Sequence, residues 1–357
     1  MMWGGDYEMV APTAYASVNG TCFDGKASIV GMKRKRGWAV MLMLANLGSV
    51  AGQTPTFKAQ APLVVVPVTV SSKNGERIWG LQQGDFQLFD NGRERKATVE
   101  PWGTYQARVA LAVVIQTSVI SKAALLKVKK MAGMLDDITG EGGEVAVITV
   151  DSEVKTCLAF TGRWEPVQET FEKLHASGGN AGKILDGVDA AIDLLAKKPA
   201  DQRRLVLLLS EARDRGSEAK ASAVLTHAQQ QNVTIYTASY SAYVTPFTTK
   251  AREQPVEAAG GLDIIGLFLE IHQATKQNVG KALAGYTGGR NLSFETLHRL
   301  EDDLVEIGKE VHSQYQLSFA PEAETNPVYH ELVVKVKAHP NAVVRARPGY
   351  WSGVRER

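Results

Sequence analysis

The chain has 357 residues, of which 44% are hydrophobic and 22% charged, and its formal net charge is +2. An ordinary apolar fraction with so little net charge excludes disorder over most of the chain, and at about 100–200 residues per domain the length gives two or three domains. Because 40 basic residues balance 38 acidic ones, the composition gives no reason to expect nucleic-acid binding over the whole surface.

Residues 32–51 have the pattern of a secretion signal. A basic run at 32–36 precedes an apolar stretch at 37–48, which is too short to span a bilayer, and small residues follow. The alternative is a buried helix with a basic N-terminus, which the helix dipole disfavours. The pattern therefore predicts an exported protein.

A secretion signal should begin the polypeptide, yet 31 residues precede this one. We predict that translation starts at Met32 and that residues 1–31 are a non-native extension or disordered. The mature protein then begins near Gly52 and keeps one cysteine, Cys157. Because Cys157 lies in a predicted apolar strand, we expect its thiol to be inert in the core. An uncleaved anchor would change the attachment of the protein but not its compartment.

Short strands without helices between them come next. Strands are expected at 63–70, within 80–92 and at 96–102, and Pro67 suggests that the first is an edge strand or carries a bulge. Residues 60–105 therefore predict part of a small β-domain.

From residue 107 the pattern changes to alternating strands and helices. Strands are predicted at 109–115, 144–150, 154–160, 205–210, 233–239 and 291–294. Helices are predicted at 123–134, 164–175, 184–195, 218–230, 264–283 and 295–312. Several of these strands are continuously apolar, as in a sheet covered on both faces. Residues 107–312 therefore predict a doubly wound, mostly parallel sheet with helices on both faces.

The C-terminal part returns to β-structure. Residues 315–320, 330–337 and 342–346 alternate as half-buried strands do. Neither β-rich end has enough strands to be stable alone. We predict one β-sandwich built from 60–105 and 313–352, with the α/β domain inserted between its strands.

Segments in a fixed order carry a resemblance to a known family. The first buried strand ends in Val114-Ile115-Gln116-Thr117-Ser118-Val119-Ile120-Ser121, and a later one continues as Ser210-Glu211-Ala212-Arg213-Asp214. Further matching segments are 81–86, 90–92, 285–289, 315–319 and 345–351. The chain resembles von Willebrand factor A-type (VWA) domain proteins, and more narrowly the acidobacterial VWFA-related family of exported proteins. The resemblance covers nearly everything from residue 63 to 351.

This resemblance implies a metal-ion-dependent adhesion site at the C-terminal edge of the sheet. The family's Asp-x-Ser-x-Ser loop, a Thr and an Asp hold Mg²⁺ there, and a partner's carboxylate completes its oxygen shell. The corresponding residues in this chain are Gln116, Ser118, Ile120, Gly182 and Glu211. One hydroxyl and one carboxylate are a poor cage for Mg²⁺, so we predict a degenerate, metal-free site. Ser121 or Asp214 would have to substitute if the ion were to bind.

Other motifs give weaker signals. Residues 177–184 end in Gly-Lys before a helix but lack the other residues of a phosphate-binding loop. The seven histidines, His330 among them, are scattered without metal-ligand spacing, and most are expected at element surfaces. Ser118 has no nucleophile-elbow motif around it. The long polar insertion at 240–257 follows a strand's C-terminal end, which makes it a candidate recognition loop.

These features predict an exported, non-catalytic protein-binding module of the adhesion or assembly type. We expect no cofactor, no nucleic-acid partner and no membrane span in the mature chain, and an unidentified protein partner in the cell envelope. The expected location is periplasmic, secreted or envelope-associated. Two alternatives stay open: an envelope hydrolase with a site around Ser118, and a purely structural envelope scaffold.

Overall fold

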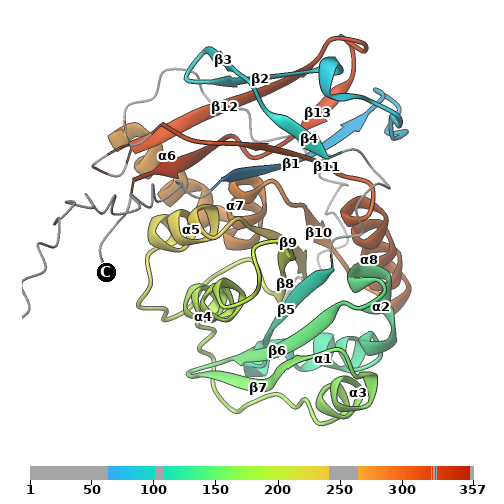
Figure 1. The fold of residues 1–357 in the computed structure, drawn as a ribbon. Coiled ribbons are helices and arrows are strands. Elements are labelled where there is room, and N and C mark those ends of the chain that lie inside the picture. The colour runs from blue at the N-terminus through green and yellow to red at the C-terminus, as the bar shows by residue number, and fades with distance from the viewer. Residues whose placement is uncertain are drawn as a thin grey trace, which may run out of the picture. The chain divides into compact units, whose positions relative to one another are not determined.

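A six-stranded sheet forms the centre of the α/β part of this computed structural model, which describes residues 63–100, 108–240 and 264–353 except 323, 325 and 327 (Figure 1). The strands are β5 (Val109–Gln116), β6 (Glu144–Val150), β7 (Val154–Thr161), β8 (Arg203–Ser210), β9 (Val233–Ser239) and β10 (Asn291–Ser293). Their order is β10-β9-β8-β5-β6-β7, and all neighbours are parallel except β6 and β7. This confirms the predicted doubly wound, mostly parallel sheet.

Helices cover both faces of this sheet. One face is covered by α1 (Lys122–Val128), α2 (Asp136–Thr139), α3 (Trp164–Glu172) and α8 (Leu297–Val311). The other is covered by α4 (Ile184–Ala196), α5 (Ala221–Gln230) and α7 (Val279–Thr287), and α6 (Ile264–Gln277) packs on α5 and α7. Successive residues of β5 enter the two cores alternately, so the whole strand is buried. Figure 1 shows α4 and α5 on the opposite side of the sheet from α2 and α8.

Two of the predicted helices are each divided. The helix expected at 264–283 is broken at Asn278, whose backbone is extended and whose side chain caps α7 by accepting a hydrogen bond from Lys281 N at 2.8 Å. The helix expected at 123–134 ends at Val128 and continues as tighter turns with i to i−3 hydrogen bonds. These turns bring Met131 and Leu135 into the core, where both are fully buried.

Both ends of the chain build one sandwich of two four-stranded sheets. The first sheet, in the order β13-β1-β11-β4, consists of β1 (Val64–Ser71), β4 (Thr98–Glu100), β11 (Tyr315–Phe319) and β13 (Val343–Arg345). The second, in the order β14-β12-β2-β3, consists of β2 (Phe86–Asp90), β3 (Arg93–Arg95), β12 (Val328–Val336) and β14 (Gly349–Ser352). β1 pairs with β11 and β2 with β12, and a common apolar core lies between the sheets. The predicted pairing between the two ends is therefore confirmed.

One expectation about a single residue holds in part and one is wrong. β1 lies between β11 and β13 without a bulge, but β11 pairs with Val64–Val68 and β13 only with Thr69–Ser71. Pro67 therefore lies where β1 has a paired strand on one side only, as an edge position requires. Cys157 is exposed rather than buried, because β7 is the antiparallel edge strand and several of its side chains point to solvent.

The described residues contain no helix that is long and apolar enough to cross a membrane.

Candidate functional site

The predicted site residues lie at the edge of the sheet where the parallel strands end. β5 ends at Gln116, and Glu211 follows β8 directly. The carboxyl ends of neighbouring parallel strands meet at one edge, which brings these two residues together. The loop before α4 lies against the loop after β5, since Ser177 N donates to Thr117 O at 2.7 Å and Val119 N donates to Gly179 O at 2.8 Å.

The Gln116 amide occupies the centre of this edge. Its Nε2 donates to Ser118 Oγ at 2.8 Å and to Glu211 Oε1 at 3.2 Å, and its Oε1 accepts from Glu211 N at 2.9 Å. This orientation follows from the partners, because a carboxylate can only accept and a backbone N–H can only donate. Gln116 and Ser118 are fully buried, and Glu211 is 5% exposed.

Arg215 completes the network and was not among the predicted site residues. Its Nε donates to Glu211 Oε1 at 2.9 Å, and a second guanidinium nitrogen donates to Oε2 at 3.2 Å. Two backbone hydrogen bonds between Arg215 and Gly182, at 2.9 and 3.0 Å, hold it in place. A positive charge therefore already faces the Glu211 carboxylate. The one sequence feature that could have indicated this ion pair is the spacing of four residues between Glu211 and Arg215.

Tyr240 closes the network from the end of β9. Its hydroxyl lies 2.5 Å from Ser121 Oγ and 3.4 Å from Gln116 Oε1. Burial raises the pKa of Tyr240, so the phenol stays protonated and able to donate at neutral pH. Tyr240 begins the polar insertion that was predicted as a candidate recognition loop, and residues 241–257 of that insertion lie outside the described residues.

The residues that could substitute as metal ligands have other partners. Asp214 accepts a hydrogen bond from Leu185 N at 3.0 Å, which satisfies a backbone N–H at the start of α4. It also accepts a hydrogen bond from Ser217 Oγ at 2.6 Å. Ser121 bonds to Tyr240. Ile120 lies in the turn after Ser118, where it is partly buried, and supplies no oxygen from its side chain.

These residues do not fit Mg²⁺. The ion requires near-octahedral oxygen ligands, whereas the oxygens of Ser118 and Glu211 face the N–H groups of Gln116 and Arg215. Across the part of the chain that the structure describes, no group of three or more His, Cys, Asp or Glu residues could hold a metal.

The space that the Gln116 side chain takes also explains why residue 182 is a glycine. A Cβ at position 182 would lie 2.5 Å from Gln116 Nε2, inside contact distance. We expect Gly182→Ala to lower the free energy of unfolding by about 1–3 kcal/mol through overpacking, as measured by urea denaturation. Gly178→Ala is the matched control, because a Cβ there meets nothing within 4 Å.

Shortening Gln116 should relieve this clash. The double variant Gln116→Ala/Gly182→Ala is expected to lose less stability than the sum of the two single variants. Additive losses, or equal losses at positions 178 and 182, would show that the amide does not fill the space beside Gly182.

A second polar cluster lies in the sandwich, where no sequence motif indicates it. His330 Nδ1 is 2.7 Å from Asp90 Oδ1, and His330 Nε2 is 2.9 Å from Ser352 Oγ. All three side chains are buried, so His330 is not one of the histidines at an element surface. The order Asp-His-Ser is that of a hydrolase triad. Ser352 is only 4% exposed, however, and its Oγ also lies 3.3 Å from Val328 O. We therefore assign the cluster a structural role that links β2, β12 and β14.

Comparisons with known proteins show similarity of fold alone. No protein-family model matches the chain, and no curated protein matches it significantly. Among solved structures, a von Willebrand factor type A protein from Catenulispora acidiphila is similar over 83% of this chain and 75% of its own, with 12% identity and a TM-score of 0.42. The conserved hypothetical protein BatB from Bacteroides thetaiotaomicron is similar over 56% and 99%, with 12% identity and a TM-score of 0.39. Proximal thread matrix protein 1 from the mussel byssus is similar over 60% and 48%, with 13% identity and a TM-score of 0.41.

Proposed function

We propose that this chain is a non-catalytic protein-binding module of the adhesion or assembly type, whose recognition edge works without a metal ion. The network of Gln116, Ser118, Glu211 and Arg215 is the observation that carries this proposal. A metal-dependent site leaves one coordination position for a partner's carboxylate. Here the Glu211 carboxylate is paired with Arg215 instead, so a partner has to bind the surface of the loops.

That surface combines apolar and basic groups. Val119 is 42% exposed in the loop after β5, and the Arg215 side chain is 41% exposed although it is paired with Glu211. Arginine is enriched at protein interfaces, and the buried centre of an interface is more apolar than its rim. Contacts through Val119 and the exposed part of Arg215 therefore suit a protein partner.

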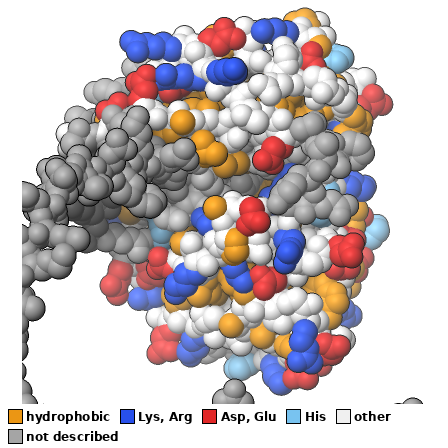
Figure 2. All heavy atoms as spheres, viewed as in Figure 1, with side chains coloured by type: hydrophobic (Ala, Val, Ile, Leu, Met, Phe, Trp, Pro, Cys, Tyr) orange, Lys and Arg blue, Asp and Glu red, His pale blue; other side chains and the backbone are white. Residues whose placement is uncertain are grey.

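The alternatives have less support. Within the described residues, the hydrogen-bond partners of Ser118 Oγ are Gln116 and Ser121, and neither is a base that could activate a serine nucleophile. Figure 2 shows acidic and basic side chains interspersed over the face in view, which does not suit nucleic acid.

Export is the second part of the proposal. The charged, apolar and small residues at 32–51 support it, and they lie outside the described residues. We propose a periplasmic, secreted or envelope-associated protein whose mature chain begins near Gly52. Its parts are a β-sandwich at 60–105 and 313–352 and a VWA-type domain at 107–312.

The test is capture of partners from an envelope extract with the mature chain as bait. We expect a partner that stays bound when a chelator is added, because no metal bridges the contact. Val119→Asp should release it, since the charge would enter an apolar contact. Val343→Asp is the matched control, because Val343 is 41% exposed on β13 of the sandwich.

Two results would contradict the proposal. Release by the chelator would restore metal-dependent capture. Equal effects of Val119→Asp and Val343→Asp would place the contact away from this edge.

A further inference from the structure

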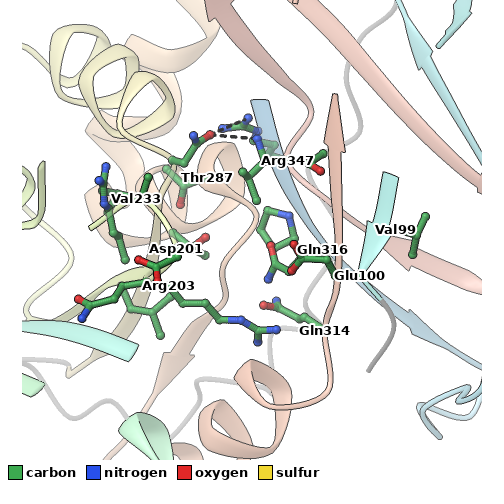
Figure 3. Close-up of a pocket in the computed structure, with 18 residues that line it drawn as sticks. Val99, Glu100, Asp201, Arg203, Val233, Thr287, Gln314, Gln316 and Arg347 are labelled. Atoms are coloured by element: carbon green, nitrogen blue, oxygen red, sulfur yellow. Dashed lines mark hydrogen bonds between the residues drawn. The ribbon is translucent and has the colours of Figure 1, made fainter. Parts of the chain in front are cut away.

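A cavity of about 520 Å³ lies at the opposite edge of the α/β sheet, where β8 and β9 begin. Its other wall is the sandwich, which contributes residues of β1, β4 and β11. Figure 3 shows the Arg203 side chain of β8 pointing toward Gln314, which directly precedes β11. The cavity therefore lies between the two parts of the fold and far from Gln116 along the same sheet.

Three arginines line this cavity: Arg203, Arg204 and Arg347. Arg347 is only 3% exposed, and the Nε atoms of all three are buried without a hydrogen-bond partner. No carboxylate of the described residues lies within 4.0 Å of these three guanidinium groups. Glu100 and Asp201 also line the cavity, but both are exposed residues. The buried part of the cavity is thus positively charged.

Backbone carbonyls orient these arginines without neutralising them. Arg347 donates to Gln229 O of α5 at 3.3 Å, Arg204 donates to Gln231 O just after α5 at 3.0 Å, and Arg203 donates to Val311 O of α8. The C-terminus of a helix carries only about half a negative charge. Burial lowers the pKa of Arg347 to about 10 and also lowers the pKa of Arg203. Both stay protonated at neutral pH.

Neutral polar groups fill much of the remaining lining. Gln316 is 9% exposed, and Gln202 Oε1 is a buried acceptor without a donor. A buried cation without a counter-ion is costly, and so is a buried acceptor without a donor. One bound molecule that brings both an anionic group and a hydroxyl would remove both costs.

We propose that this cavity binds a small organic anion that carries a carboxylate or phosphate together with hydroxyl groups. The guanidinium fork matches both kinds of anion. The volume lies within the range of about 300–1,000 Å³ that is usual for small-molecule sites. Because Arg203 comes from the α/β sheet and Gln316 from the sandwich, the anion would link the two. This site is independent of the protein-binding edge.

Isothermal titration calorimetry on the mature chain tests the proposal, with citrate and glucose 6-phosphate as probes at constant ionic strength. We expect saturable binding of at least one probe and none of glucose. Arg203→Gln should weaken binding about tenfold or more, since one charged pair of donors is lost. Arg203→Lys should recover part of that loss, because it keeps the charge without the fork. The exposed Arg213→Gln is the matched control and should bind as the unmodified chain does.

Failure of both organic anions to bind at millimolar concentration would overturn the proposal. Equal weakening by Arg203→Gln and Arg213→Gln would do so as well, because it would show a general charge effect. Arg347→Gln is a second cavity variant if Arg203→Gln does not fold. Equal effects of Val119→Asp and Val343→Asp on partner capture would overturn the proposed function without changing anion binding in this cavity, so the two proposals can fail separately.

Discussion

Replacing His330 with alanine is expected to lower the free energy of unfolding by about 3 kcal/mol. His330 bonds to Asp90 at 2.7 Å and to Ser352 at 2.9 Å, and its ring stacks on Tyr350 at 4.7 Å between centroids. Without the imidazole, the buried Asp90 carboxylate keeps Arg95 and Tyr350 as partners but loses its shortest hydrogen bond.

The position of the cluster adds to this effect. Asp90 ends β2 near the start of the chain, whereas His330 and Ser352 lie on β12 and β14 near its end. The cluster therefore holds together strands that are far apart in sequence. Urea denaturation of the His330→Ala variant measures the loss.

Two further variants provide reference values for the loss of stability in His330→Ala. Ser352→Ala removes a hydroxyl that lies within hydrogen-bond distance of His330 Nε2 and Val328 O, and should cost about 1 kcal/mol. His339→Ala is the control at an exposed histidine and should change stability by less than about 0.5 kcal/mol. Equal effects at positions 330 and 339 would show that the buried network contributes nothing.

Restoring the adhesion-site residues is expected to create Mg²⁺-dependent stability. The required changes are Gln116→Asp, Ile120→Ser, Gly182→Thr, Glu211→Asp and Arg215→Ala. At a Mg²⁺ concentration about 100 times the dissociation constant, binding would stabilise the native state by about 2.7 kcal/mol, which a thermal melt detects as a higher Tm.

The changes have to be made together because the residues depend on each other. Threonine at position 182 would clash with Gln116, and the guanidinium of Arg215 would compete for the carboxylate at position 211. The same variant with Arg215 retained is the control and should respond less to Mg²⁺. No response from either would show that these loops do not correspond to the adhesion-site loops.

Most of the fold could be predicted because apolar periodicity is a local property. The fully buried β5 and the alternating strands near both ends predicted the sheet and the shared sandwich. The division at Asn278 was missed, since the apolar pattern continues across a capping residue. The exposure of Cys157 was missed because a strand's composition does not show that it is an edge strand.

The candidate site could be predicted in position but not in detail. The resemblance noted in the sequence implied that Gln116 and Glu211 lie at one edge of the sheet, and only the fold shows that the amide of Gln116 takes the space beside Gly182. Arg215 has helical-type spacing from Glu211 in a segment that is not a helix, so spacing alone was too weak a signal to predict their ion pair. The buried contact between His330 and Asp90 could not be predicted, because nothing near His330 in the sequence indicates Asp90 as its partner.

Calorimetric titration of Mg²⁺ into the unmodified chain is the most direct test of the proposal that the recognition edge works without a metal ion. Since the Glu211 carboxylate is already paired with Arg215 and Gln116, we expect no saturable heat at millimolar Mg²⁺ and no change of Tm beyond that of matched ionic strength. Saturable binding that Glu211→Ala abolishes would contradict this account and make metal-dependent capture of a carboxylate the leading mechanism.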